Sequence, residues 1–171
     1  MISRKVFAAS LFMLCFACIG CEEDNSSPID TTPDISGNLI KVDGCKNGLL
    51  KSAADNNQGC VQFTYDPVAR TLTLLHVNAG FNCCPKAIRA DVVVEDSVIR
   101  ITESESGGQC RCECLFGLHI LVENIPAQTY TIKVIEPILN AQETPLEFTV
   151  DFSRETEGEH CVPRNFYPWG I

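Results

Sequence analysis

The chain has 171 residues, of which 45% are hydrophobic and 20% are charged, and its formal net charge is -9 at pH 7. This length suits one domain with tails, and a mean hydropathy of +0.06 is typical of a globular protein with a core. Removing residues 1–20 leaves 13 minus 2 basic residues against 22 acidic residues, a formal charge of -11. Binding to nucleic acid needs clustered Lys and Arg, so this charge argues against nucleic acid as a partner.

Residues 1–20 have the pattern of a secretory signal peptide. Arg4 and Lys5 precede an apolar run from Val6 to Ile19, and Gly20 and a cysteine follow it. A helix of about 14 residues rises about 1.5 Å per residue, so it does not cross a hydrocarbon core of about 30 Å. The pattern therefore favours a cleaved signal over a permanent membrane helix.

Cys18-Ile19-Gly20-Cys21 resembles the lipobox of bacterial lipoproteins, with Cys18 in place of the usual Leu. The resemblance implies that Cys21 becomes the first residue and carries acyl chains that anchor it in a membrane. The alternative is an ordinary signal peptide that is cut nearby. Glu22-Glu23-Asp24 resembles the acidic export signal of lipoproteins on the outer face of the outer membrane, so cell-surface exposure is expected, with a periplasm-facing position as the alternative.

The segment that follows is poor in large apolar residues. From Asn25 to Asn38 it consists mainly of Ser, Thr, Pro and Asp, a composition that buries too little surface to order itself. The expected organisation is therefore a signal peptide at 1–20, a lipidated acidic tether at 21–38 and a folded domain at 39–171.

Eight cysteines lie in this domain, an even number that predicts disulfides in an oxidising compartment. They are Cys45, Cys60, Cys83, Cys84, Cys110, Cys112, Cys114 and Cys161. The polar loop between Cys45 and Cys60 suggests that these two are bonded. Bonds within vicinal or strand-neighbour cysteines strain the required Cβ separation of about 4 Å. The expected pattern therefore gives Cys83 and Cys84 one partner each among residues 110, 112 and 114, and gives the third to Cys161, which leaves six pairings open.

The stretch from Cys110 to Val122 places three cysteines and then Phe, Leu, Ile and Val at alternate positions. Because side chains in a strand alternate with period two, one inward-facing strand is predicted. A soft-metal site at residues 83, 84, 110, 112 and 114 is the competing hypothesis. Same-face neighbours lie about 6.7 Å apart, whereas zinc thiolates each lie about 2.3 Å from the metal. No metal or other cofactor is therefore expected.

Short alternating runs bounded by turn residues predict strands along the rest of the domain. The predicted strands are 39–42, 61–65, 71–77, 88–95, 98–103, 110–122, 130–134 and 146–153. Residues 66–70, 78–85, 96–97 and 104–109 are predicted as turns or loops, and no long helical period follows the signal. This pattern favours an all-β antiparallel sandwich, with a small up-and-down barrel as the alternative.

Two resemblances agree with this fold class. Asn124 to Val134 resembles the penultimate connection of immunoglobulin-like and fibronectin-type sandwiches, in which a Tyr, here Tyr130, heads a strand and its hydroxyl tethers the corner. The region of about residues 60 to 136, with Asn82-Cys83-Cys84-Pro85 and the Cys-x-Cys-x-Cys stretch, resembles a set of small bacterial lipoproteins. That second resemblance implies architecture alone.

No catalytic pattern is present in the sequence. His76 is predicted to be half-buried or at a rim, His119 to pair with solvated Glu113 and Glu123, and His160 to be surface charge. Loop carboxylates are predicted to be solvated: Glu103, Glu105, Glu155, Glu157 and Glu159. The chain is accordingly expected not to be an enzyme.

The expected function is that of a lipid-anchored surface module without catalysis, which binds an unknown surface or periplasmic ligand or has a structural role. The Gly80–Pro85 loop and the aromatic segment from Phe166 to Trp169 are the predicted contact elements, because exposed aromatics mark recognition surfaces. The alternative from another class is an extracytoplasmic thiol protein that binds metal or carries out redox chemistry.

Overall fold

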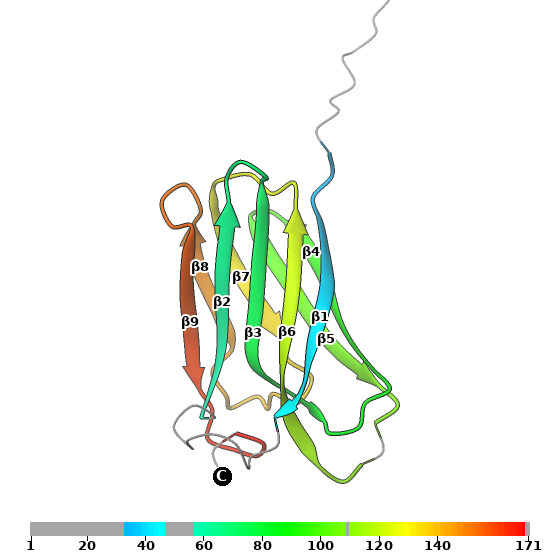
Figure 1. Cartoon of the computed structure of the whole chain (residues 1–171). Helices are drawn as coiled ribbons and strands as arrows, with labels where there is room; N and C mark the ends of the chain where they lie inside the picture. The colour runs from blue at the N-terminus through cyan, green and yellow to red at the C-terminus, as the bar shows by residue number, and fades with distance from the viewer. Residues whose placement is uncertain (1–32, 47–56, 109, 170–171) are drawn as a thin grey trace, which may run out of the picture. The chain divides into compact units, whose positions relative to one another are not determined.

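Two packed β-sheets form the folded part of the chain in the computed structural model, which describes residues 33–46, 57–108 and 110–169 (Figure 1). One sheet has the strand order β1-β6-β3-β2-β9 and the other β4-β5-β7-β8. The strands are β1 (Ser36–Lys46), β2 (Gln58–Asp66), β3 (Thr71–Asn82), β4 (Ala87–Glu95), β5 (Val98–Ser106), β6 (Glu113–Glu123), β7 (Thr129–Ile135), β8 (Leu146–Asp151) and β9 (Glu157–Pro163). The sheets do not close into a barrel, so the predicted sandwich is confirmed and the barrel alternative is wrong.

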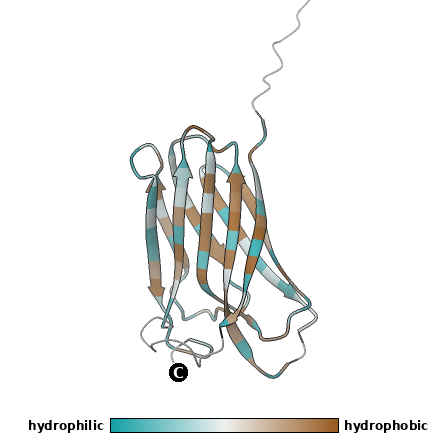
Figure 2. Ribbon diagram, in the orientation of Figure 1, coloured by the Kyte–Doolittle hydropathy of each residue, from teal (hydrophilic) through white to brown (hydrophobic). Residues whose placement is uncertain are grey.

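Neighbouring strands pair antiparallel, apart from the parallel pair β5 and β7. Apolar and polar segments alternate along the strands (Figure 2). In β2, for example, Val61, Phe63 and Tyr65 are buried while Gln62 and Thr64 are exposed. This alternation places one face of each sheet in the core and the other in water. Within the described residues, no helix is long and apolar enough to cross a membrane.

The strand predictions are largely confirmed, with four differences. Strand β3 continues to Asn82 through much of the predicted loop 78–85, and β9 was not predicted as a strand at all. Strand β1 begins at Ser36, inside the segment predicted as a tether. The Cys-rich strand begins only at Glu113, so Cys110 and Cys112 precede it and are exposed, contrary to the prediction that they face inward.

A tyrosine tether is present, but it comes from a different residue than the one predicted. Tyr130 lies in β7 and is buried in the core. The hydroxyl group of Tyr65, on β2, donates a hydrogen bond of 3.1 Å to the carbonyl oxygen of Ile125 in the connection before β7. Because β2 and β7 belong to different sheets, this hydrogen bond ties the connection to the opposite sheet.

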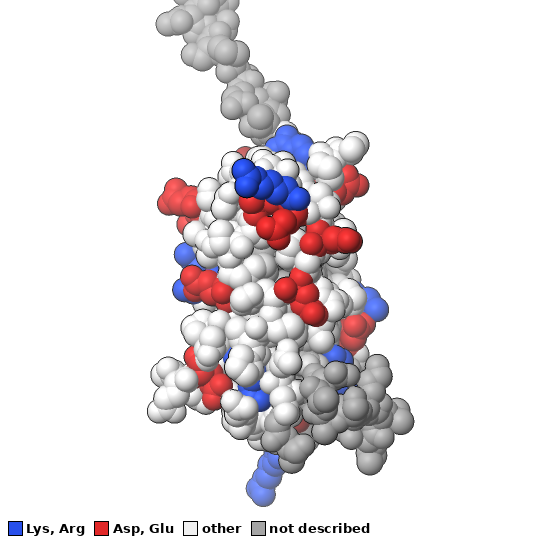
Figure 3. All heavy atoms as spheres, turned by 90° about the vertical axis from the view of Figure 1, so that its left-hand side faces the viewer, with Lys and Arg blue, Asp and Glu red and all other residues white. Residues whose placement is uncertain are grey.

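The side of the sandwich formed by the edge strands β8 and β9 carries many acidic side chains (Figure 3). Glu155, Glu157 and Glu159 are exposed there, as predicted, and Glu159 accepts a hydrogen bond of 2.8 Å from Gln62. Like charges along an edge strand oppose pairing with a second chain. The acidic edge therefore protects the sheet from edge-to-edge association.

Four disulfides join the eight cysteines of the domain. They are Cys45–Cys114, Cys60–Cys161, Cys83–Cys112 and Cys84–Cys110. Cys83 and Cys84 each bond one residue of the Cys-rich stretch, as predicted. The predicted Cys45–Cys60 bond is wrong, and the third cysteine of the stretch does not bond Cys161.

The strand order explains these two corrections. Strands β1 and β2 are not neighbours, because β6 and β3 lie between them, so Cys45 on β1 reaches Cys114 on the adjacent β6. Cys60 on β2 lies directly opposite Cys161 on β9, with 4.1 Å between their Cα atoms. Cys60 is the near partner of Cys45 in the sequence, but Cys114 is the partner on the neighbouring strand, and Cys45 bonds Cys114.

Different strand ends and segments lie at the two ends of the sandwich. At the end where β1 starts, called the Ser36 end, Ser36 pairs with Glu123. At the other end, called the disulfide end, β1 finishes at Lys46 and β3 and β6 meet at Asn82 and Glu113. The eight bonded cysteines belong to the strand ends and connections at this second end. The C-terminal segment 164–169 also lies there (Figure 1).

Candidate functional site

Several inward-facing apolar stripes end in an ionisable residue. On β3 the stripe is Leu72, Leu74, His76; on β5 it is Ile99, Ile101, Glu103; on β7 and the residue after it, it is Ile132, Val134, Glu136; and Val162 on β9 is followed two positions later by Arg164. Side chains two positions apart share a face of a strand. The four ionisable residues therefore continue into the space between the sheets, and we call them the buried charge network.

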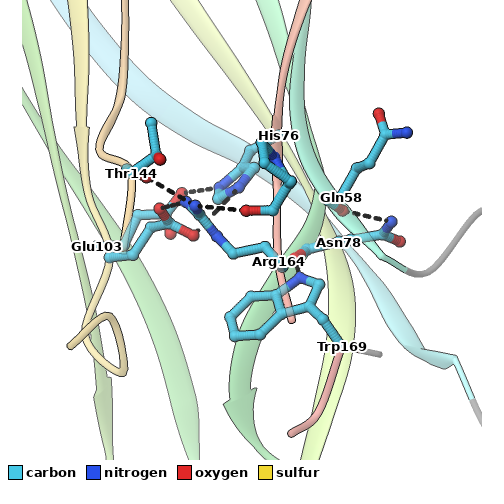
Figure 4. A network of polar contacts seen from close by, with 9 residues as sticks. Gln58, His76, Asn78, Glu103, Thr144, Arg164 and Trp169 are labelled. Atoms are coloured by element: carbon cyan, nitrogen blue, oxygen red, sulfur yellow. Dashed lines mark hydrogen bonds and ion pairs between the residues drawn. The ribbon is translucent and has the colours of Figure 1, made fainter. Parts of the chain in front are cut away.

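The network is compact and shielded from solvent. The exposed fractions are 1% for His76, 3% for Glu103, 6% for Glu136 and 0% for Arg164. The Nδ1 atom of His76 lies 2.7 Å from Oε1 of Glu103, and its Nε2 atom lies 3.9 Å from Oε1 of Glu136. Arg164 donates from Nη2 to Oε2 of Glu136. His76 on β3, Glu103 on β5 and Arg164 directly after β9 converge on one another (Figure 4).

The charges balance when His76 is protonated. Burial opposes protonation of His76, but the carboxylates of Glu103 and Glu136 outweigh this effect, so the pKa of His76 is raised above 6.5. Burial raises the pKa of Glu136, and the neighbouring His76 and Arg164 act in the opposite direction. With both carboxylates ionised, two cations face two anions, the arrangement that buried charges require.

The C-terminal segment closes the network on one side. Arg164 donates from Nη1 to the carbonyl oxygen of Thr144 at 2.7 Å, and its guanidinium carbon lies 5.8 Å from the ring centroid of Trp169. Trp169 is fully buried and donates from Nε1 to the carbonyl oxygen of Asn78 at 2.8 Å. The segment is thus held by a cation-π contact and by hydrogen bonds to the backbone of other elements.

Asn78 provides the acceptor because β3 is irregular at this point. It has a φ of 63°, and the pairing of β3 with β6 shifts register between Val77 and Ala79. Asn is one of the few residues that adopts this backbone region readily. Its side chain donates to the carbonyl oxygen of Gln58 at 2.9 Å and accepts from Lys46 at 2.9 Å. The bulge therefore links β1, β2 and the C-terminal segment.

The sequence predicts His76 to be half-buried or at a rim and Glu103 to be solvated, whereas both side chains are buried. Glu136 and Arg164 were not recognised as site residues. The signal was present in the alternation, because each residue lies two positions after an apolar residue that faces the core. This alternation does not show whether the ionisable residue is buried or exposed, because an apolar stripe also stops where a strand leaves the core. Only the packing of the second sheet shows which of these two positions the residue has.

The other histidines also have partners different from those expected. The Nε2 atom of His119 lies 2.8 Å from Oδ2 of Asp43 on the outer face of the five-stranded sheet. His160 is half-buried and stacks on Phe148, with 4.7 Å between the ring centroids. Neither histidine contacts the buried charge network. They are pairs at the periphery of the sandwich.

The predicted contact elements are only partly exposed. Gly80 and Phe81 belong to β3, and Trp169 is in the core, so these residues offer no surface for recognition. Tyr167 is the large aromatic of the segment 166–169 that is well exposed, at 48%. Its hydroxyl is held by both the backbone nitrogen and the carbonyl oxygen of Glu113.

The geometry bears on metal binding as well. The five cysteines of the soft-metal hypothesis all share disulfides, so their sulfurs are not thiolates. Among the described residues, the group of three convergent ligand types is Cys60, Glu159 and Cys161, and its two cysteines are bonded to each other. In the buried charge network, the carboxylate of Glu136 is bonded to the guanidinium group of Arg164. This arrangement suits pairing between the protein's own charges.

Replacing Gly80 by Ala is expected to lower the free energy of unfolding by about 1–3 kcal/mol. A Cβ atom at Gly80 would lie 2.5 Å from ring atom Cη2 of Trp169 and 2.5 Å from Cδ1 of Ile138, so Trp169 would have to move. Gly44→Ala is the matched control, because a Cβ there would meet nothing within 4 Å. Urea unfolding measures both, and equal stability of the two variants would contradict the proposed packing.

The raised pKa of His76 predicts that stability falls at alkaline pH. A folded-state pKa above the unfolded value of 6.5 gives a contribution that is complete below that pH and is lost as pH rises through the folded pKa. The expected loss approaches about 1.4 kcal/mol per pH unit in that range.

An NMR titration of the His76 ring in the wild-type chain measures this pKa directly. Urea unfolding at several pH values then tests the slope, which His119→Gln should retain and His76→Gln should lose. A His76 ring that titrates at or below 6.5 would contradict the assignment.

No protein-family model matches this chain, and no curated protein or solved structure matches it significantly. The sequence and the structure together define a disulfide-bonded β-sandwich domain whose two sheets share a buried charge network.

Proposed function

We propose that the chain is a lipoprotein, anchored in the outer membrane through lipid on Cys21 and exposed at the cell surface, where its domain acts as a binding or structural module without catalysis. The signal-like residues 1–20 and the lipobox-like residues that end at Cys21 support the anchor. Four disulfides support an oxidising compartment outside the cytoplasm. The ligand of such a module is open.

The position of Ser36 is the observation that carries this proposal. Strand β1 starts at the Ser36 end, opposite the disulfides and the C-terminal segment. Anchored through Cys21, the chain would enter the domain at the Ser36 end, and the disulfide end is the opposite end of the sandwich.

The buried charge network supports a role without catalysis. Acid–base chemistry requires a titratable group within hydrogen-bonding reach of a substrate. Each of the four residues of the network is less than a tenth exposed, and the fully buried Trp169 covers Arg164. The groups are arranged to pair with one another, which favours a structural role for them.

Labelling with a fatty-acid analogue in a Gram-negative host tests the anchor. The wild-type chain should carry the label and remain with membranes, and Cys21→Ala should lose both. Cys15→Ala is the matched control, because Cys15 is a nearby cysteine outside the lipobox-like residues 18–21 and is not expected to be acylated. A Cys21→Ala chain that keeps the label would contradict the proposal.

Surface exposure is tested by biotinylating lysines on intact cells with a reagent that does not cross membranes. The proposal expects labelling of the wild-type chain before the cells are opened. Labelling only after permeabilisation would contradict surface display and indicate a periplasm-facing domain.

A further inference from the structure

The four disulfides differ in their environment, and one differs most. Cys84 and Cys110 are both exposed, whereas Cys60 and Cys114 are 8% and 6% exposed and hold the other members of their pairs against the sheets. Cys84 lies between β3 and β4, and Cys110 lies between β5 and β6. The Cys84–Cys110 bond thus joins two connections outside the strands, so opening it breaks no strand pairing.

A second bond joins the same two connections. Cys83 bonds Cys112, next to the Cys84–Cys110 bond. A disulfide stabilises mainly by closing a loop in the unfolded chain, and a short loop contributes less than a long one. Because Cys83–Cys112 already joins the connections, the additional closure by Cys84–Cys110 spans only a few residues. Its loss therefore leaves the fold in place.

The polarity of the exposed bond is set by one hydrogen bond. The backbone nitrogen of Cys110 lies 3.1 Å from Sγ of Cys84 and donates to it. An N–H group directed at sulfur stabilises the thiolate more than the thiol, and a more stable thiolate leaves faster in thiol–disulfide exchange. Cys84 is thus the leaving sulfur and Cys110 the sulfur that is attacked. The amide oxygen of Asn82 lies 3.4 Å from the same sulfur and can accept a hydrogen bond from the Cys84 thiol once that sulfur has been protonated.

We propose that Cys84–Cys110 is a thiol–disulfide exchange site, independent of the lipid anchor, whose reaction partner is a thiol. A partner thiolate attacks Sγ of Cys110, the Sγ–Sγ bond breaks, and Cys84 departs as a thiolate. A second partner thiolate attacks the partner sulfur of the mixed disulfide and releases the Cys110 thiolate. Two thiols are oxidised to one disulfide, the Cys84–Cys110 bond takes up two electrons, and the two protons released by the partner thiols go to Cys84 and Cys110.

Graded reduction of the oxidised chain with glutathione, followed by alkylation and peptide mass mapping, tests this site. The first two thiols should appear at Cys84 and Cys110, about tenfold or more faster than at Cys45 and Cys114. Samples quenched early should carry glutathione on Cys110. First reduction at another pair, glutathione mainly on Cys84, or release of all eight thiols together with loss of the near-ultraviolet circular dichroism signal would overturn the proposal.

Two double variants show whether the fast reduction belongs to Cys84–Cys110 or to the disulfides of the chain in general. Cys84→Ser with Cys110→Ser should abolish the fast release of two thiols, and Cys83→Ser with Cys112→Ser should keep it. A fast phase that survives in the first variant contradicts the assignment. A parallel reaction with reduced thioredoxin compares a protein thiol with the small thiol, and selective opening of Cys84–Cys110 by either supports the site.

Discussion

Replacing Arg164 by Met is expected to lower the free energy of unfolding by about 3–5 kcal/mol, measured by urea denaturation at neutral pH. The change leaves the carboxylate of Glu136 buried without its guanidinium partner, and it also removes the hydrogen bond to Thr144 and the contact with Trp169. An uncompensated buried charge is among the most costly single defects in a folded protein.

A second ion pair provides the control for Arg164→Met. Lys133 and Glu147 lie 3.0 Å apart, and their side chains are 40% and 42% exposed. Lys133→Met is expected to cost only about 0–1 kcal/mol, because solvent screens an exposed pair. Adding Glu136→Gln to Arg164→Met should recover part of the loss, since both charges are then gone. Equal effects of Arg164→Met and Lys133→Met would contradict the energetic role of the network.

Removing the Cys60–Cys161 disulfide by replacing both cysteines with Ala is expected to destabilise the chain by up to about 4.7 kcal/mol. The two residues are 101 positions apart in sequence, the largest separation among the four bonds. The bond holds β9 against β2 and so fixes the strand that leads to Arg164. Thermal unfolding under non-reducing conditions measures the effect.

The adjacent pair of bonds supplies the matched comparison. Cys83→Ala with Cys112→Ala removes a bond between residues 29 positions apart, and Cys84–Cys110 still joins the same connections. The expected cost is only about 2 kcal/mol, as for closing a very short loop. A larger loss in this variant than in the Cys60/Cys161 variant would show that local strand contacts, rather than loop closure, set the contribution of each bond.

Alternation of apolar and polar residues predicts most strands correctly because the period of two is a local property of the chain. Val61, Phe63 and Tyr65 are an example, and the hairpin of β4 and β5 around Asp96 and Ser97 is another. Strand β9 escaped prediction because its sequence, Glu157–Pro163, places charge and glycine where an apolar stripe would be expected. Gly158 lies against the ring of Phe63 and needs no side chain of its own there.

The candidate site was the hardest part to predict. His76, Glu103, Glu136 and Arg164 are spread over 89 positions of the chain, and none is adjacent to another in sequence. Each occupies the next inward position after an apolar stripe. Whether that position faces the core or the solvent depends on how far the opposite sheet extends, and this distance is a property of the packed sandwich.

The sequence by itself determined that this is an all-β domain with an even set of cysteines, because strand periodicity and cysteine count are properties of the chain. Only the tertiary structure decided which cysteines are bonded and which charges are buried, because both depend on which strands become neighbours. Cys45 pairs with Cys114 and not with Cys60 for that reason. His76 meets Glu103 across the core for the same reason, since β3 and β5 belong to opposite sheets.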